Sequence, residues 1–130
     1  MMRALLLTLL LGLPAQAKPN ANELCNQADG LLARHEIKAG IDKYFQAIEQ
    51  DKKCARAYAA LGHVYYEASS GGAEPDRLSN FAIQLLDKAI LLNPKDDKSL
   101  FYRGDLYVNQ QQFAKALKDL NRSLAIRPGS

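Results

Sequence analysis

The sequence predicts an all-α protein in which three helix–turn–helix hairpins stack side by side. One observation is a sparse pattern of apolar, glycine and alanine positions that recurs at about residues 21–54, 55–96 and 97–130. A second observation is that six segments carry apolar residues at the spacing of one helix face. A period of about 34 residues is typical of stacked hairpins, because one such unit cannot bury its apolar face alone.

The repeated positions are clearest in the last two copies of the pattern. The last copy holds Leu100, Gly104, Tyr107, Ala116, Leu120 and Pro128. The middle copy holds Tyr58, Leu61, Gly62, Tyr65, Ala82, Leu86, Ala89 and Pro94. The first and weakest copy holds Leu24, Ala28, Leu31, Gly40, Tyr44 and Ala47. The first and last copies fit one frame of 34 residues, and the middle copy fits it with eight extra residues.

Each copy predicts two helices. Their expected ranges are 23–34 with 38–52, 55–68 with 75–92, and 98–109 with 113–126. Pro94 and Pro128 are expected to end the second and third hairpins, because proline lacks the amide that continues a helix. Gly62 and Gly104 are expected where the two helices of a hairpin cross, since a side chain there would push the backbones apart.

The eight extra residues of the middle copy fall within 67–80, around the run of serines and glycines at 69–72. They predict a turn followed by a second helix that is lengthened at its start, with Pro75 in the first turn. Such a segment beside a groove can form a binding lip, and it can equally be a tolerated surface insertion.

The pattern resembles that of the tetratricopeptide repeat family: aromatic, Leu-Gly, aromatic, Ala, aromatic, Ala, Pro. This resemblance implies a right-handed α-solenoid. The first copy departs from the family pattern at Ala28, Gly40 and Lys52, and the last departs at Arg103 and Ser123. A generic helical bundle is the competing interpretation, and two copies in register argue against it.

The first 17 residues are expected to be a cleaved signal peptide, which leaves a repeat domain at 18–130. Arg3 supplies a positive start, residues 4–13 are apolar, and Ala15 and Ala17 are small residues at the cleavage positions. A bilayer span needs roughly 20 apolar residues, so a stable membrane anchor is not expected. The sequence therefore predicts export to the periplasm or the extracellular space.

The two cysteines are expected to form a structural disulfide. Cys25 lies early in the first predicted helix and Cys54 lies just past the end of the second, so the two ends meet in an antiparallel pair. An exported chain would meet oxidising conditions. Free or intermolecular thiols are the alternative. Redox chemistry or a metal site is not expected, because there is no Cys-x-x-Cys and neither His35 nor His63 has ligand spacing to a cysteine.

Neither the motifs nor the charge of the chain indicates an enzyme or a nucleic-acid binder. The sequence has no glycine-rich phosphate loop, no His-x-x-x-His and no serine in a nucleophile elbow. The formal net charge is +3, without a run of five or six like charges. We therefore expect no catalysis, no cofactor, and neither a nucleic-acid nor a membrane-surface partner.

The resemblance implies a concave groove formed by the first helix of each hairpin. The groove residues that it implies are Asp29, Leu32, Arg56, His63, Tyr66, Lys98, Phe101, Asp105 and Val108. Apolar and charged groups in one groove suit peptide capture. Chaperone-binding members clamp a terminal carboxylate with two lysines, two asparagines and an arginine. The corresponding positions here are Cys25, Asp29, Ala60, Lys98 and Tyr102. Only Lys98 matches, so that clamp is not expected.

The function expected from the sequence is that of a non-catalytic adaptor or assembly factor of the cell envelope, with a protein or peptide partner in the groove. The alternative is a self-associating module that dimerises through its last hairpin. No further helix is predicted after Pro128, so Leu117, Leu124 and Ile126 are expected to be partly exposed.

Overall fold

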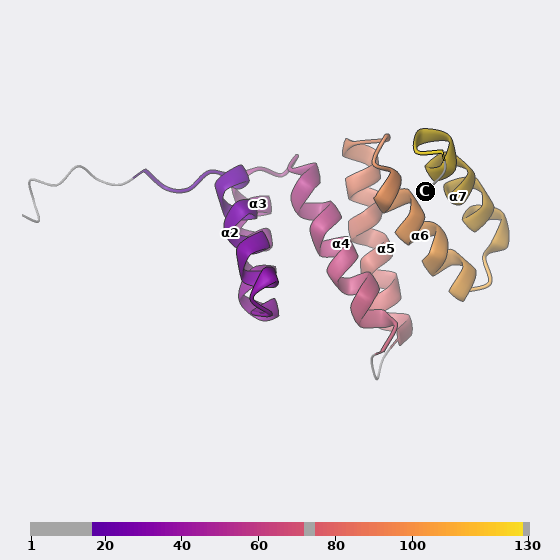
Figure 1. Cartoon of the computed structure of the whole chain (residues 1–130), viewed down its shortest axis with the longest axis horizontal. Helices are drawn as coiled ribbons and strands as arrows, with labels where there is room; N and C mark the ends of the chain where they lie inside the picture. Colours follow the sequence, from indigo (N-terminus) through magenta and orange to yellow (C-terminus); the bar gives the residue numbers. More distant parts are fainter. Residues whose placement is uncertain (1–16, 72–74, 129–130) are drawn as a thin grey trace, which may run out of the picture.

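The computed structural model describes residues 17–71 and 75–128, which form six helices and no strand (Figure 1). The helices are α2 (Ala21–Ala33), α3 (Ile37–Gln50), α4 (Ala55–Ser69), α5 (Pro75–Leu92), α6 (Asp97–Asn109) and α7 (Phe113–Ile126). All six predicted helices are confirmed, with ends that differ from the expected ones by two residues at most. The predicted signal peptide lies almost entirely at 1–16, outside the described residues.

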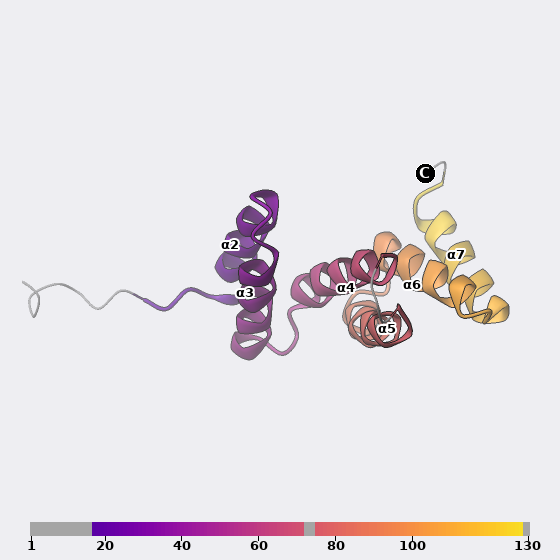
Figure 2. The same ribbon diagram turned by 90° about the horizontal axis from the view of Figure 1, so that it is seen from below.

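Neighbouring helices pair as α2 with α3, α4 with α5 and α6 with α7. The three hairpins follow one another along the long axis of the molecule, with α4 and α5 between the other two pairs (Figures 1 and 2). The first hairpin joins the second where α3 packs against α4, and α6 packs against both α4 and α5. This arrangement confirms the predicted α-solenoid. No helix of the described residues has the length and apolar character needed to cross a bilayer.

Two glycines allow close helix crossings, as expected from the sequence. A Cβ atom at Gly62 would lie 2.5 Å from Cδ2 of Leu86, and one at Gly104 would lie 2.9 Å from Cδ2 of Leu120. Both distances are shorter than packed carbon atoms tolerate. The glycine of the first helix and the leucine of the second therefore fit together as a pair in each of the last two hairpins.

The helices α2 and α6 end in the same way. The residue after each C-cap, His35 or Gln111, has a φ of 62° or 60°, in the left-handed region. The amide of Glu36 donates to the carbonyl of Leu31 at 2.9 Å, and the amide of Gln112 donates to that of Tyr107 at 2.8 Å. These bonds close a Schellman motif, which usually has glycine at the left-handed position. The turn between the helices is thereby short in both hairpins.

The eight extra residues of the middle hairpin lengthen its helices. α4 has 15 residues and α5 has 18, whereas the corresponding helices α6 and α7 have 13 and 14. α5 begins at Pro75, so the prediction that the second helix is lengthened at its start is confirmed. The part of the predicted turn at 72–74 lies outside the described residues.

The apolar core runs through the contacts between hairpins. One buried cluster joins Cys25 and Tyr44 of the first hairpin to Leu61 and Leu85 of the second. A smaller cluster joins Leu86 of α5 to other side chains of the second and third hairpins. Because each hairpin buries part of its apolar surface against the next, the three units depend on one another for stability.

Candidate functional site

The helices α2, α4 and α6 carry all of the predicted groove residues. Asp29 and Leu32 lie on α2; Arg56, His63 and Tyr66 lie on α4; Lys98, Phe101, Asp105 and Val108 lie on α6. The structure joins some of them across hairpins through hydrogen bonds and ring contacts, and it leaves others exposed without such partners. This difference separates the predicted groove residues that join the hairpins from those that stay exposed.

At the first junction, Arg56 uses its guanidinium to hold α4 against α2. Its Nη1 donates to Asn22 at 2.6 Å, and its Nη2 donates to Asn26 at 2.8 Å and to Asp29 at 2.6 Å. Asp29 also accepts a hydrogen bond from the hydroxyl of Tyr44. The bond to Asp29 raises the pKa of Arg56 above its usual range. The chain itself therefore satisfies the charges at this end of the groove.

At the second junction, aromatic rings hold α4 against α6. The ring of His63 stacks on that of Tyr102, with centroids 4.4 Å apart and planes at 6°, and the Tyr66 ring lies 4.8 Å from the same ring. The hydroxyl of Tyr66 donates to Asp105 at 2.7 Å. Burial, followed by this hydrogen bond, raises the pKa of Tyr66 to about 12. Nε2 of His63 lies 2.8 Å from Oε1 of Glu67.

Tyr102 is central to this junction, and it was not among the predicted groove residues. It is half-buried and contacts the rings of His63, Tyr66 and Phe101. The sequence contained one signal for it, because Tyr102 stands at a position where the peptide clamp would require a charged or amide side chain. An aromatic residue there replaces polar peptide contacts with ring stacking.

A hollow of about 250 Å³ lies beside this aromatic junction. Its lining residues include His63, Tyr102 and Lys98. Ala59 and Ala60 of α4 and Asp96 and Ser99 at the start of α6 complete it. Lys98 is exposed, and its ammonium forms no ion pair with a carboxylate in the described part of the chain. An unpaired cation next to an aromatic face can bind a carboxylate or a carbonyl group.

Phe101 and Val108 give this end of the groove an apolar surface. Their side chains are 47% and 38% exposed on α6. Leu32 differs from them, because it is half-buried and lies close to Gly40 of α3. The apolar groups of the predicted groove that are most exposed to solvent are thus those of the last hairpin.

The two cysteines lie side by side, with their sulfur atoms 3.9 Å apart as free thiols. Cys25 is fully buried and Cys54 is partly exposed. Burial, followed by the neighbouring Cys54, raises the pKa of Cys25 to about 12. The disulfide stays a prediction. Among residues 17–71 and 75–128, no group of His, Cys, Asp and Glu side chains has the arrangement of a metal site.

Comparisons with known proteins bear on the fold. The family model of the tetratricopeptide repeat matches residues 97–130. A search of curated proteins gives no match.

Among solved structures, the first TPR domain of Spaghetti (RPAP3), bound to the HSP90 peptide SRMEEVD, has a TM-score of 0.73 and 19% identity. It covers 85% of this chain and 82% of its own. The Arabidopsis OM64 TPR domain has a TM-score of 0.71 and 17% identity, with 85% and 84% covered. The first TPR domain of human RPAP3 has a TM-score of 0.69 and 19% identity, with 85% and 80% covered.

Proposed function

Because the chain folds as a stack of tetratricopeptide repeats, we propose that it is a non-catalytic adaptor or assembly factor that binds a peptide segment of a partner protein. The peptide lies along the groove of α4 and α6. The fold supports many unrelated processes, so the proposal depends on the groove of this chain and not on the fold alone.

One observation carries the proposal. The α6 side of the groove keeps an exposed ammonium at Lys98 and an exposed ring at Phe101, next to the stacked rings of His63 and Tyr102. An apolar anchor beside an unpaired charge is the usual basis of peptide recognition, because the first supplies affinity and the second sets the register. The stacked rings give this surface a rigid floor, so little conformational entropy is lost on binding.

The peptide bound in the similar structures indicates how this fold can hold a peptide. It does not identify the partner of this chain. Two TPR domains with this fold are described as bound to the HSP90 peptide SRMEEVD. Of the five clamp positions, this chain keeps only Lys98, and Arg56 already binds Asp29. We therefore propose a peptide that offers a single carboxylate to Lys98 and an apolar side chain to Phe101.

The proposed location is the periplasm or the extracellular space, as a component of the cell envelope. The support is the amino-acid pattern of residues 1–17, with its positive start, apolar stretch and small residues at the cleavage positions. The adjacent thiols of Cys25 and Cys54 are consistent with an oxidising compartment, in which they would form a bridge.

A crosslinked pull-down from envelope extract tests the proposed function. The bait is the chain itself, compared with a Lys98→Ala, Phe101→Ala variant. The matched control is Lys88→Ala, Leu91→Ala, which also removes one exposed lysine and one exposed apolar side chain, both on α5. We expect a captured protein that the control retains and the groove variant loses. Equal capture by both variants would contradict binding in the groove.

A further inference from the structure

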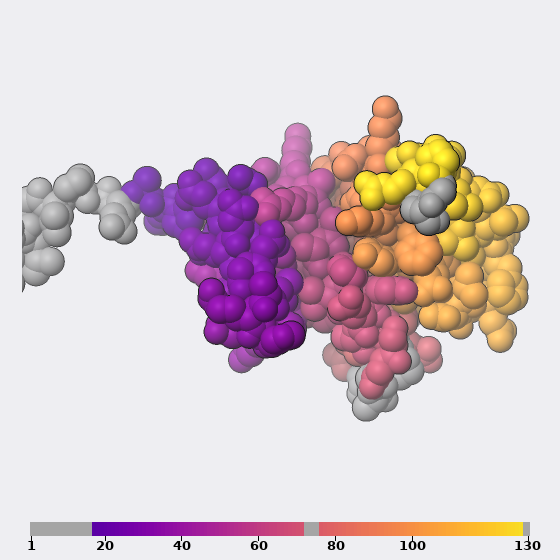
Figure 3. Space-filling view, viewed as in Figure 1, coloured from indigo at the N-terminus to yellow at the C-terminus, as the bar shows by residue number. Residues whose placement is uncertain are grey.

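A small hollow of about 170 Å³ in the last hairpin is lined mainly by positive side chains. We call it the basic hollow. The hairpin that carries it forms one end of the molecule, drawn in orange to yellow in Figure 3. The six lining residues are Arg103 and Tyr107 of α6 and Lys115, Lys118, Asp119 and Arg122 of α7.

The carboxylates at the basic hollow are already engaged. Asp119 is buried, and both of its oxygens accept hydrogen bonds from Arg103. The remaining nitrogen of the same guanidinium donates to Asp87 of α5. Even with Asp87 counted, four positive side chains meet only two negative ones here. The hollow therefore keeps an excess of positive charge.

Three cations of α7 supply this excess. Lys115, Lys118 and Arg122 are three or four positions apart, which places them on one face of the helix. Both lysines are exposed, and neither forms an ion pair with any residue that the structure describes. Arg122 donates only to the carbonyl of Pro94, at 3.4 Å. Like charges at this spacing repel one another and destabilise the helix, so a bound anion would relieve the repulsion.

The middle copy of the repeat shows that the fold does not require charges at these positions. Arg103 and Asp119 stand where the middle copy has Leu61 and Leu85. Both leucines are buried in the core cluster that joins the first two hairpins. An apolar pair is often as stable as a buried ion pair, or more stable. Packing alone therefore does not explain why the last hairpin carries charges here.

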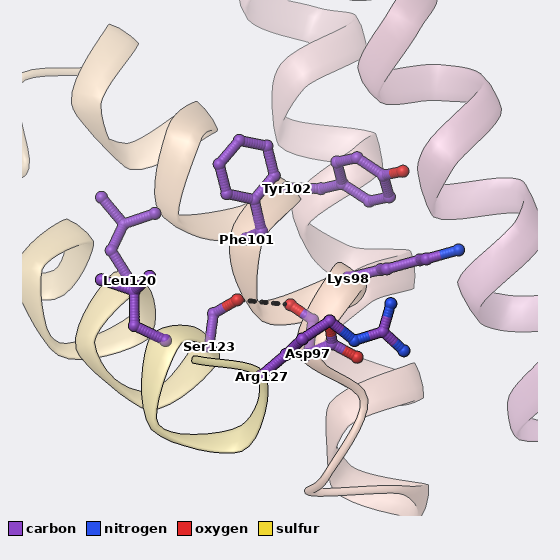
Figure 4. Close-up of a pocket in the computed structure, with 8 residues that line it drawn as sticks. Asp97, Lys98, Phe101, Tyr102, Leu120, Ser123 and Arg127 are labelled. Carbon is purple, nitrogen blue, oxygen red and sulfur yellow. Dashed lines mark hydrogen bonds and ion pairs between the residues drawn. The ribbon is translucent and has the colours of Figure 1, made fainter. Parts of the chain in front are cut away.

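The other hollow of the last hairpin has a different character. It has a volume of about 440 Å³, and the apolar side chains Phe101 and Leu120 contribute to its lining (Figure 4). Its Arg127 forms an ion pair with Asp97, with 3.3 Å between Nε and Oδ2. One cation there, Lys98, has no carboxylate partner in the described part of the chain, against three cations at the basic hollow.

The size and lining of the basic hollow indicate what kind of anion it suits. Pockets for drug-sized ligands have volumes of roughly 300–1,000 Å³, so this hollow suits a smaller group. Apart from the ring of Tyr107, no apolar side chain lines it, so it offers no anchor for a peptide side chain or a lipid chain. Donors on three separate side chains suit a tetrahedral oxyanion, which presents acceptors in several directions, and lysine is a common ligand of phosphate.

We propose that the basic hollow binds a small phosphate-type oxyanion, held by the ammonium groups of Lys115 and Lys118 and by the free N–H groups of Arg122. Arg103 stays paired with Asp119 and forms the inner wall of the site. This inference goes beyond the proposed function and does not depend on it, because none of the six lining residues belongs to the predicted groove.

Thermal melts with pyrophosphate, inorganic phosphate and succinate test the inference. All are made at one ionic strength, because salt screens exposed charges. We expect about 10 mM pyrophosphate to raise the melting temperature by about 3–5 °C, as a ligand with a dissociation constant of about 1 mM would. Inorganic phosphate, with less charge, should give a smaller rise. Succinate should give almost none, since its carboxylates are planar and lie far apart.

Two lysine variants locate the site. Lys115→Gln, Lys118→Gln removes two cations from the basic hollow. Lys52→Gln, Lys53→Gln is the matched control, because it removes two exposed lysines between α3 and α4 and changes the net charge equally. We expect the first variant to lose the rise in melting temperature and the control to keep it. The Lys98→Ala, Phe101→Ala groove variant should also keep it, so this test and the pull-down can fail separately.

Co-sedimentation with vesicles of phosphatidylcholine and phosphatidic acid distinguishes a lipid headgroup from a free anion. We expect the chain to stay in the supernatant. Binding to the vesicles that Lys115→Gln, Lys118→Gln abolishes would make a lipid the ligand and overturn the assignment to a small anion.

Three results of the melts would also overturn the inference. One is no rise in melting temperature with either phosphate compound. Another is an equal rise with succinate, which would remove the preference for phosphate. The third is an equal loss of the rise in both lysine variants, which would make the effect one of net charge and not of the basic hollow.

Discussion

Arg103 forms two parallel hydrogen bonds with the buried carboxylate of Asp119. Its Nε lies 2.7 Å from Oδ2 and its Nη2 lies 2.8 Å from Oδ1, and its third nitrogen donates to Asp87 at 2.8 Å. These bonds join α6 to α7 and to α5, and they raise the pKa of Arg103 above its usual range. In the middle copy the positions of Arg103 and Asp119 hold the buried leucines Leu61 and Leu85.

The first prediction concerns this pair. Arg103→Leu leaves the Asp119 carboxylate buried without its partner, so we expect the free energy of unfolding to fall by about 3 kcal/mol. Arg103→Leu combined with Asp119→Leu reproduces the apolar pair of the second hairpin and should recover most of that loss. Urea denaturation measures both variants. If the double variant were no more stable than Arg103→Leu alone, the loss of stability would not come from the unpaired carboxylate of Asp119.

The second prediction concerns the helix crossing at Gly62. Gly62→Ala forces its new Cβ against the fully buried Leu86, so we expect a loss of about 1–3 kcal/mol. Gly30→Ala is the matched control, since a Cβ there meets nothing within 4 Å. It should stabilise the chain by up to about 1 kcal/mol, because alanine favours the helix. Thermal melts compare the two variants. Equal changes in melting temperature would contradict a clash between the new Cβ and Leu86 at the helix crossing.

The third prediction concerns the left-handed residue after α6. Gln111 has a φ of 60°, where glycine is not strained, so Gln111→Gly should raise the melting temperature. The expected gain is about 0.5–1 kcal/mol, since the entropy cost of glycine offsets part of the relief. Gln110→Gly is the control, because that C-cap has a φ of −88° and should gain nothing. A lower melting temperature for Gln111→Gly would refute the prediction.

The fourth prediction concerns the two thiols. We expect the oxidised chain to be bridged between Cys25 and Cys54, which closes a loop of about 30 residues and adds roughly 3 kcal/mol in the chain-entropy model. Thermal melts with and without reductant measure this contribution, and the Cys25→Ala, Cys54→Ala variant should not respond to reductant. A wild-type melting temperature that reductant leaves unchanged would argue against the bridge.

The fifth prediction concerns the pH dependence of the reduced chain. The pKa of Cys25 rises from 9.0 to about 12 on folding, so the folded state holds this proton more tightly than the unfolded state. The stabilisation is complete below pH 9 and is lost as the pH rises towards 12. We expect the melting temperature of reduced wild type to fall more between pH 9 and 11 than that of Cys25→Ala. If the melting temperatures of the two proteins fell in parallel as the pH rises, the loss of stability would not come from deprotonation of Cys25.

The sequence by itself determined the hairpins. Helix periodicity, the glycines at 62 and 104 and the prolines at 94 and 128 all act within a hairpin or at its end, so the six helices and their pairing follow from local patterns. The positions of the groove residues on α2, α4 and α6 follow from the same frame. Arg103 was visible only as a mismatch with the repeat pattern, since its partner lies on another helix.

Only the tertiary structure decided which predicted groove residues are bonded between hairpins and which stay exposed. Tyr66 and Asp105 are 39 positions apart, and Arg56 and Asp29 are 27 apart, yet each pair is hydrogen-bonded between hairpins. Such contacts depend on how one hairpin packs on the next, and local periodicity does not specify that packing. Leu124 shows the same dependence on packing. It stands at the position that Ile90 occupies in the middle copy, yet Leu124 is 53% exposed and Ile90 is 6% exposed, and only the placement of the neighbouring helices distinguishes the two.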